Sequence, residues 1–554
     1  MEVAARQSAI LSMQTRCRKA HATSARQPFQ QRRESEVRGG APHSNAFRRA
    51  LAPPTGLSAR RRDGRARQSL HHPHSNAQTG PTAMHCRARR SGMGELRGGF
   101  PGEFFDESSR LRVAAINHKE PEMKVGSNWR SAHNNDAALP AFLAARVDRY
   151  YTERVQESWA GGHIMKGRVA DARALHLSSN DYLSIARHPE ILDAMCMSIR
   201  SEGNGLLMSG VFLHGDDCPQ LKLEDRFATF MGAEAGVLCQ SGFAANTGLI
   251  QSIANAQTPV YVDMMAHMSL WEGIRSAGAR AISFFHNDVD HLEQRIQRYG
   301  AGVVIVDSVY STNGSVAPLA AIADVCAEHD CVLVVDESHS LGTHGPHGAG
   351  MVSELGLLDR VHFRTASLAK AFAGRAGFIS CSRRFQEYFK CEALPAIFSS
   401  TLLPHEVMGL AATLDVIERD DWRRTRLAAN ARYVRARLTE LGYNLNGSET
   451  QIVALEAGAE PDTIVLRDAL EKRGIFGSVF CAPATAQNRS LVRLSINATL
   501  SEQELERLVD VCEEIRDEVQ MRNWPSTRRN ERAGRTRPRA PQPVVNMPMV
   551  AVAA

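Results

Sequence analysis

The sequence predicts an α/β fold in which a seven-stranded, mostly parallel sheet is covered by helices on both faces. Seven short runs within residues 236–380 are apolar and rich in β-branched residues, as strands buried on both faces are. Segments with helical periodicity separate most of these runs, including 247–255, 289–299 and 317–328. Polar, chemically active side chains come directly after two of the runs, which is where ligands bind in open α/β sheets.

The ordered part of the chain is expected to begin near Leu139. The apolar positions of residues 146–151 recur at helical spacing, which predicts a helix there. The seven strands follow in order, each a run of four or five residues. They are predicted at residues 236–239, 259–262, 281–285, 303–306, 331–335, 362–365 and 377–380.

The two ends of the chain differ from its body in charge. Residues 1–100 contain 19 Lys and Arg against 5 Asp and Glu and show no sustained apolar periodicity, so we expect residues 1–138 to be a disordered basic extension. Two alternatives for this extension are an organelle transit peptide, and a gene model that starts too early, with translation beginning at Met93 or Met123. Residues 521–554 are a second basic segment that we also expect to be disordered.

The composition argues against several classes of function. The formal net charge is +6, but residues 101–520 carry 40 basic against 54 acidic side chains, and neither basic end has a nucleic-acid-binding motif. No nucleic-acid partner is therefore expected. No apolar stretch is long enough to span a membrane, and the N-terminus lacks the apolar core of a secretion signal. A cytoplasmic location is the simplest expectation.

A metal site is not expected either. The eleven cysteines form no metal-like spacing, and Cys239, Cys326 and Cys331 fall in or beside apolar runs, where buried, reduced thiols are expected. The histidine tract at residues 71–74 lies in the basic extension, where solvated polar sequence is the more common interpretation.

The candidate site is predicted at the edge of the sheet where the strands end. Asp336 and His339 follow the strand 331–335, and Lys370 follows the strand 362–365. Taken singly, Asp336 could be a helix cap, His339 a buried polar residue and Lys370 a solvated lysine. Together, a strand-terminal carboxylate and a lysine at one edge are the arrangement that pyridoxal phosphate requires.

The chemistry of this cofactor gives each residue type a role. Lys370 would hold the cofactor as a Schiff base and move the α-proton of the substrate, once burial has made its amine neutral. Asp336 would keep the pyridine nitrogen protonated. His339 would donate to the phenolic oxygen, and His267 would stack on the face of the ring.

The phosphate of the cofactor needs backbone N–H groups at a helix N-terminus, together with hydroxyl groups. The small-residue turn that begins with Ser241, Gly242 and Phe243 stands between a predicted strand and a predicted helix. Ser367, three residues before the lysine, would add a hydroxyl.

Five motifs together resemble the α-oxoamine synthases, which are pyridoxal-phosphate enzymes of fold type I. The resemblance spans residues 139–516. Further segments resemble the branch of this family that makes α-hydroxyketone signals for quorum sensing. The family motifs are residues 178–183, 241–246, 267–270, 336–340 and 367–370, and the branch-like segments are 266–273, 306–312, 336–346, 395–404 and 477–481.

The resemblance implies a domain organisation and a homodimer. After an N-terminal arm and helix at 139–190, we expect a large cofactor-binding domain at 191–405 and a smaller α+β domain at 406–520. Ser400 would reach the phosphate of the partner subunit's cofactor, so that each site would be complete only in the dimer.

The implied reaction joins an acyl group from a fatty acyl-CoA, of medium chain length, to an amino donor, with loss of CoA. S-adenosylmethionine and 2-aminobutyrate are both expected donors, and the α-aminoketone product would be the precursor of an α-hydroxyketone signal. One alternative is a primary-metabolism synthase, such as 8-amino-7-oxononanoate synthase or glycine C-acetyltransferase. Another, a non-enzymatic binding protein on the same fold, is disfavoured because every residue that the chemistry needs is present.

The resemblance also assigns substrate-binding residues. Arg493 would bind the carboxylate of the amino donor, although an exposed strand residue is the favoured interpretation without the resemblance. Asn180 and Thr485 would line the substrate site, and Ser311 would lie near the cofactor ring.

The loop at residues 203–212 is more apolar than its Gly- and Thr-rich counterpart in the biotin-, haem- and threonine-pathway members of the family. Leu206, Leu207, Met208 and Phe212 would suit an acyl chain of medium or greater length. The alternative is that they are dimer-interface or core residues.

Overall fold

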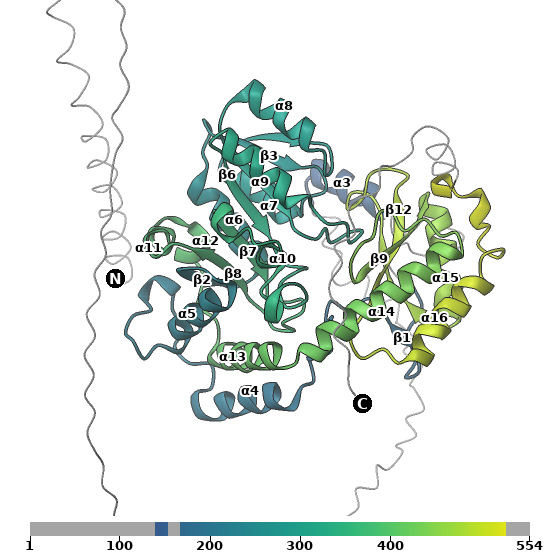
Figure 1. The fold of residues 1–554 in the computed structure, drawn as a ribbon, viewed down its shortest axis with the longest axis horizontal. Helices are drawn as coiled ribbons and strands as arrows, with labels where there is room; N and C mark the ends of the chain where they lie inside the picture. The colour runs from purple at the N-terminus through teal and green to yellow at the C-terminus, as the bar shows by residue number, and fades with distance from the viewer. Residues whose placement is uncertain (1–138, 153–166, 528–554) are drawn as a thin grey trace, which may run out of the picture. The chain divides into compact units, whose positions relative to one another are not determined.

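A seven-stranded sheet is the central element of the fold, as the sequence predicts (Figure 1). The computed structural model describes residues 139–152 and 167–527. The strand order is β2-β8-β7-β6-β5-β3-β4, in which β8 is antiparallel to both of its neighbours and the other pairs are parallel. The strands are β2 (Ala235–Cys239), β3 (Pro259–Asp263), β4 (Arg280–Phe284), β5 (Val303–Asp307), β6 (Val332–Asp336), β7 (Phe363–Ser367) and β8 (Gly377–Cys381).

Both faces of this sheet are buried. Val304 and Val306 of β5 belong to one apolar cluster, whereas Val303 and Ile305 belong to another, because successive strand residues point to opposite faces. The first cluster includes residues of α5 (Pro219–Met231), α8 (Val289–Tyr299), α9 (Leu319–Glu328) and α13 (Pro404–Arg419). The second includes residues of α6 (Gly242–Ile253), α7 (Met268–Ser276) and α11 (Arg383–Glu392). The prediction of a sheet covered on both sides is confirmed.

Capping side chains explain where two of the predicted helices begin. Helix α8 covers the predicted residues 289–299, and the side chain of Asp288 accepts the N–H of His291 at its start. Helix α6 begins at Gly242, five residues before the predicted start, because Ser241 caps it by accepting the N–H of Ala244. Its small first-turn residues carry no apolar periodicity, so the sequence pattern missed this turn.

A second, three-stranded antiparallel sheet lies in the C-terminal part of the chain, in the order β11-β12-β9. A short parallel pair, β1 with β10, brings residues 175–176 beside residues 475–476. The strands are β1 (Leu175–His176), β9 (Ile452–Gly458), β10 (Ile475–Phe476), β11 (Ser478–Phe480) and β12 (Ser490–Ser495), and the helices of this part are α14 (Asp421–Glu440), α15 (Glu460–Lys472) and α16 (Glu502–Glu514).

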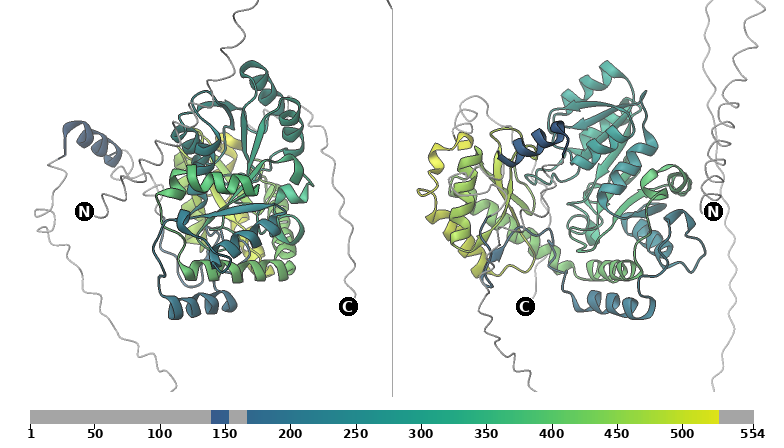
Figure 2. Two further views of the ribbon diagram at one scale, coloured as in Figure 1. Left: turned by 90° about the vertical axis from the view of Figure 1, so that its left-hand side faces the viewer. Right: turned by 180° about the vertical axis from the view of Figure 1, so that it is seen from behind.

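The remaining helices lie before and between these sheets. Figures 1 and 2 show α4 beside α13, and residues of these two helices contact each other. The remaining α-helices are α3 (Ala141–Tyr151), α4 (Pro189–Glu202), α10 (Met351–Glu354) and α12 (Leu394–Ile397).

The predicted boundary of the C-terminal disordered segment is wrong for its first residues. Trp524 is buried and donates from Nε1 to the carbonyl of Val519 at 2.9 Å, and Ser526 donates to the carbonyl of Glu456. The rest of that segment, the extension at residues 1–138 with its histidine tract, and the predictions about translation start or targeting lie outside the described residues.

Within residues 139–152 and 167–527, no helix combines the length and the apolar composition that crossing a membrane requires. The cysteines of these ranges are free thiols. Cys239, Cys326 and Cys331 are buried, which confirms that part of the prediction.

Candidate active site

The carboxyl ends of neighbouring strands bring acidic side chains to one edge of the sheet. Asp336 ends β6 and is in register with Asp307, the last residue of β5, and with Thr365 of β7. Asp336 is buried, and no ion pair ties it to a basic side chain in the described part of the chain. Its Oδ2 accepts a hydrogen bond from Nδ2 of Asn246 at 2.7 Å, and its Oδ1 accepts the N–H of Ser338 at 2.8 Å.

Lys370 lies in the turn that follows β7 and is half-buried. Burial lowers the pKa of its amine, and the positive charge of Arg493 lowers it further, while Asp336 acts in the opposite direction. A lowered pKa raises the neutral fraction of the amine, which is the form that can act as a nucleophile or accept a proton.

His267 caps the N-terminus of α7. Its Nδ1 accepts the N–H of Ser269 at 3.3 Å and lies 2.8 Å from the hydroxyl oxygen of the same residue, while its own backbone N–H donates to Asp307 at 3.3 Å. Burial lowers the pKa of the His267 imidazole; the charge of Asp336 opposes this shift and that of Lys370 adds to it. The side chain is therefore held in one orientation and favours the neutral state.

His339 is buried in the turn after β6. Its Nδ1 lies 2.7 Å from the hydroxyl of Tyr182, and its carbonyl accepts a hydrogen bond from Gln451 at 2.8 Å. Burial lowers the pKa of His339 well below its usual range, and Lys370, Arg493 and His267 shift it in the same direction. Tyr182 was not among the predicted site residues, although it stands inside the motif 178–183.

Arg493 of β12 is buried, so the interpretation as an exposed strand residue is wrong. Its Nη2 donates to Oδ1 of Asn180 at 2.7 Å, its Nη1 donates to the carbonyl of Ser311 at 2.6 Å, and the guanidinium lies 4.9 Å from the centre of the Phe480 ring. Nε has no hydrogen-bond partner, and no ion pair joins Arg493 to an acidic side chain in the described ranges. A buried cation without a carboxylate partner is costly unless a ligand supplies the anion.

The predicted phosphate-binding turn forms the N-terminus of the twelve-residue helix α6. Ser241 uses its hydroxyl as the cap, and the first N–H groups, those of Gly242 and Phe243, have no partner within the helix. A Cβ at Gly242 would lie 2.5 Å from Cβ of Ser367, so only glycine lets the helix end lie directly against the end of β7. These predicted residues are therefore brought together.

Two other predicted residues, Ser400 and Thr485, make no hydrogen bond to the other predicted site residues in the described part of the chain. The exposed Ser400 pairs with Ser209 in an isolated bridge, and its carbonyl accepts a hydrogen bond from Gln240 at 2.5 Å. The hydroxyl of Thr485, in the loop between β11 and β12, is buried and has no hydrogen-bond partner in the described residues.

Part of the apolar loop at residues 203–212 borders a cavity of about 350 Å³. Leu206, Leu207 and Phe212 are 77%, 68% and 57% exposed, so the interpretation of these three as core residues is wrong. The cavity is lined in part by Leu206, Met208, Phe212, Leu213, Thr401, Pro404 and Met408.

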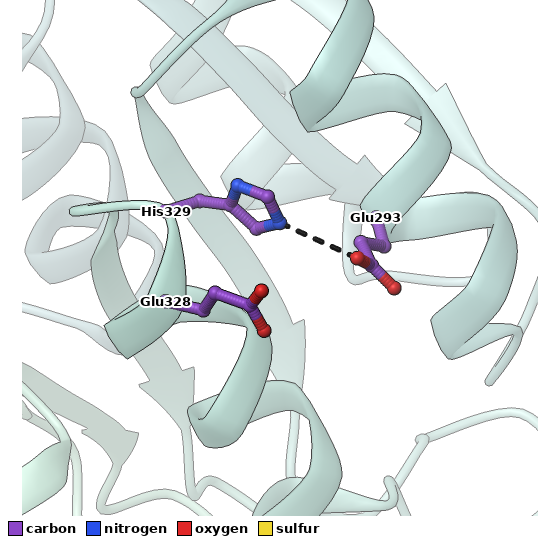
Figure 3. Close-up of side chains that lie close together, drawn as sticks. All are labelled: Glu293, Glu328 and His329. Carbon is purple, nitrogen blue, oxygen red and sulfur yellow. Dashed lines mark hydrogen bonds and ion pairs between the residues drawn. The ribbon is translucent and has the colours of Figure 1, made fainter.

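A separate group of side chains that could bind metal lies on α8, at the end of α9 and in the turn after α9 (Figure 3). The ligand atoms of Glu293, Glu328 and His329 lie within 4.8 Å of one another. Nε2 of His329 is 3.5 Å from Oε1 of Glu293, which also accepts a hydrogen bond from Gln297 at 3.0 Å. We assign this group to the packing of α8 against α9.

Comparison with known proteins assigns the chain to a family. Residues 172–511 match the family model described as aminotransferase class I and II. The chain is 46% identical over 376 residues to a CAI-1 autoinducer synthase of Vibrio campbellii. This match covers 68% of this chain and 95% of that protein. The chain is also 33% identical over 365 residues to an 8-amino-7-oxononanoate synthase of Coprothermobacter proteolyticus. This match covers 65% of this chain and 92% of that protein.

Solved structures share the fold. A structure of SPT with PLP is 25% identical, with a TM-score of 0.61, and the match covers 69% of this chain and 98% of that one. A serine palmitoyltransferase of Sphingomonas wittichii is 24% identical, also with a TM-score of 0.61. This match covers 68% of this chain and 97% of that one.

Proposed function

The chain belongs to the aminotransferase family of classes I and II and, within it, to the α-oxoamine synthases, and on this premise we propose a specific reaction. It is a pyridoxal-phosphate-dependent enzyme that transfers an acyl group. We propose that it joins a medium-chain acyl group from acyl-CoA to S-adenosylmethionine or 2-aminobutyrate. The new C–C bond replaces the C–S bond of the thioester, CoA leaves as its thiol with the α-proton, and the donor carboxylate leaves as CO₂. The product would be an α-aminoketone, the precursor of an α-hydroxyketone signal.

The side chains at the sheet edge fit the cofactor. Asp336 and Arg493 are buried charges of opposite sign, and no ion pair in the described residues neutralises either. Asp336 would pair with the protonated pyridine nitrogen, Lys370 would attach the cofactor, and the N-terminus of α6 would receive the phosphate. When bound, pyridoxal phosphate withdraws electrons from the α-carbon of an amino substrate and so makes its C–H bond acidic.

The residues of this chain would then bind the amino donor and move a proton. Arg493 binds the substrate carboxylate, and Asn180, which contacts the same guanidinium, orients it. Lys370, whose pKa is lowered by burial, takes the α-proton on its neutral Nζ. His339 donates to the phenolic oxygen, and His267 covers the ring. Ser241, Gly242, Phe243, Ser311 and Ser367 complete the cofactor contacts, and Thr485 lines the substrate site.

The argument for a dimer comes from the family resemblance, which places Ser400 at the phosphate of the partner subunit's cofactor. Ser400 is exposed, which is compatible with this role, and it pairs with Ser209 and accepts a hydrogen bond from Gln240, neither of which is a predicted site residue. We propose that it serves the partner subunit's cofactor, so that the active enzyme is a homodimer.

The apolar cavity supports the assignment of the acyl substrate. Thr401, the residue after Ser400, lines it together with Leu206, Met208 and Met408. Its volume of about 350 Å³ and its mostly apolar lining suit an alkyl chain, because burying each methylene stabilises the complex by roughly 0.8 kcal/mol. If Ser400 reaches the partner's site, this cavity lies beside that site as well.

The acyl substrate can be tested with a series of acyl-CoA thioesters. Release of CoA should be efficient with decanoyl-CoA and poor with acetyl-CoA. Met408→Phe would fill part of the cavity and should shift the preference toward shorter chains, whereas Met197→Phe, at an exposed position of α4, should leave it unchanged. An unaltered profile in Met408→Phe would contradict this acyl site.

A second candidate function is a primary-metabolism synthase, such as 8-amino-7-oxononanoate synthase or glycine C-acetyltransferase. The identity of 33% to an 8-amino-7-oxononanoate synthase favours this second candidate. The higher identity to the autoinducer synthase and the apolar loop at residues 203–212 favour the first proposal.

A further inference from the structure

Two buried polar side chains connect Asp336 to His267. Asn246 on α6 and Ser269 on α7 are 2% and 0% exposed. Nδ2 of Asn246 lies 2.7 Å from Oδ2 of Asp336 and 2.9 Å from Oγ of Ser269, and that Oγ lies 2.8 Å from Nδ1 of His267. An unbroken row of hydrogen bonds therefore runs from the carboxylate to the imidazole.

The chemistry of the donors sets the direction of each bond. A carboxylate only accepts hydrogen bonds, so the amide nitrogen of Asn246, and not its oxygen, must face Asp336. The hydroxyl of Thr365 lies 2.6 Å from Oδ1 of Asn246 and donates to it, which agrees with this orientation. The two N–H groups of Asn246 then point to Asp336 and to Ser269. Nδ1 of His267 accepts the backbone N–H of Ser269 and so has no proton to give to Oγ, which makes the O–H of Ser269 the donor in its contact with Nδ1.

Nδ1 of His267 thus receives two hydrogen bonds, from the hydroxyl of Ser269 at 2.8 Å and from the backbone N–H of Ser269 at 3.3 Å. A nitrogen that accepts two donors does not carry a proton. We propose that Asn246 and Ser269 are positioning residues that hold His267 as a neutral imidazole with its proton on Nε2. This inference rests on the proposed function for the roles of Asp336 and His267 toward the cofactor.

The charges around His267 explain why a neutral imidazole would suit this position. Lys370 acts on it as a positive charge and Asp336 as a negative one, while His339 and Asp307 also lie close to it. A protonated His267 would place a cation against a ring whose nitrogen Asp336 keeps protonated, and like charges repel. The row of hydrogen bonds that starts at Asp336 therefore keeps the stacking histidine neutral against the direct effect of the Asp336 charge, which by itself favours protonation of His267. The lowered pKa of His267 is in agreement.

Nuclear magnetic resonance can test the tautomer in the full chain with pyridoxal phosphate bound and no substrate. With ¹⁵N-labelled histidine, the signals of His267 are identified by their loss in His267→Gln. We expect an unprotonated Nδ1 and a protonated Nε2 at neutral pH. In Ser269→Ala we expect a mixture of tautomers, a higher pKa of His267, and a dissociation constant for the cofactor that rises roughly fivefold to tenfold, the effect of one buried hydrogen bond.

Ser252→Ala is the matched control, because Ser252 lies on α6 with Asn246 and donates to the carbonyl of Gly248 away from the row. It should leave the tautomer unchanged. Should Ser269→Ala fail to fold, Thr365→Val removes only the donor that orients Asn246 and should shift the tautomer in the same direction. A protonated Nδ1 in the unaltered protein would overturn the proposal. Because the measurement needs no substrate, a wrong amino donor or acyl chain would leave its outcome unaffected.

Discussion

The hydroxyl of Tyr182 lies 2.7 Å from Nδ1 of His339, although the two residues are 157 positions apart in the chain. Both side chains are buried, and burial raises the pKa of Tyr182 to about 12, so the phenol stays protonated. This contact joins the motif at residues 178–183 to the turn after β6 and fixes the orientation of the His339 ring.

Removal of the Tyr182 hydroxyl should weaken cofactor binding. In Tyr182→Phe, His339 loses a buried partner, and we expect the dissociation constant of pyridoxal phosphate to rise about fivefold, the effect of one hydrogen bond. Equilibrium dialysis with absorbance detection measures it. Tyr433→Phe, at a half-exposed position of α14, is the control, and an equal rise there would contradict the role of Tyr182.

Lys370→Ala should abolish both the attachment of the cofactor and the release of CoA. In the proposed mechanism the neutral amine of Lys370 would both attach the cofactor and move the proton, so its removal should eliminate both steps. The visible absorption of the attached cofactor should disappear, and the cofactor should be removable by dialysis. Lys472→Ala, at a surface ion pair with Glu518, should behave as the unaltered protein. Retention of the band in Lys370→Ala would refute the assignment.

Arg493→Lys should raise KM for the amino donor by roughly tenfold to a hundredfold, since a lysine cannot form the two-pronged contact to a carboxylate. KM for the acyl-CoA should change little, and this second value serves as the internal control. Steady-state kinetics with each substrate varied in turn separates the two effects. If only KM for the acyl-CoA changed, Arg493 would bind the acyl-CoA and not the amino donor, which would contradict the assignment.

The buried ion pair between Glu337 and Arg364 should stabilise the folded protein next to the candidate site. Arg364 is 3% exposed and also donates to the carbonyls of Met231 and Ala349, while Glu337 directly follows Asp336. Glu337→Ala would leave a buried cation unpaired, at a cost of about 3–5 kcal/mol in the free energy of unfolding. Urea denaturation measures this loss. The surface pair of Glu272 with Arg275 is the comparison, and Glu272→Ala should cost far less.

The buried histidines predict how stability depends on pH. The pKa of His339 in the folded protein lies below its ordinary value of about 6.5, so the unfolded chain binds a proton that the folded chain does not. The free energy of unfolding should therefore fall as the pH drops below about 6.5, by up to about 1.4 kcal/mol per pH unit for this group. Urea denaturation at several pH values should give a shallower slope for His339→Asn. An identical slope would show that His339 is not the titrating group.

The strands could be predicted from the sequence because a buried parallel strand is a continuous apolar run, and all seven predicted runs are strands. Asp336, His339 and Lys370 could be predicted as site candidates because each stands within five residues of the end of such a run. The interpretation of Arg493 was harder, since alternation along β12 alone does not distinguish a buried position from an exposed one. Its burial follows from packing against Asn180 and Phe480, which come from distant segments.

Asn246 and Tyr182 show what the sequence pattern could not supply. Asn246 lies 90 residues from Asp336, and no local spacing links the two. Both residues stand inside motifs that carry the family resemblance, so their presence was visible although their partners were not. Hydrogen bonds between distant segments depend on the register of strands and the depth at which helices pack, which a single sequence does not encode locally.

The most direct test of the proposed function is a screen of amino donors with decanoyl-CoA, with products identified by mass spectrometry and Lys370→Ala as the blank. The predicted result is CoA release with S-adenosylmethionine or 2-aminobutyrate and an α-aminoketone that carries the decanoyl chain. CoA release supported only by glycine, alanine or serine would contradict the proposal and assign the chain to the primary-metabolism synthases.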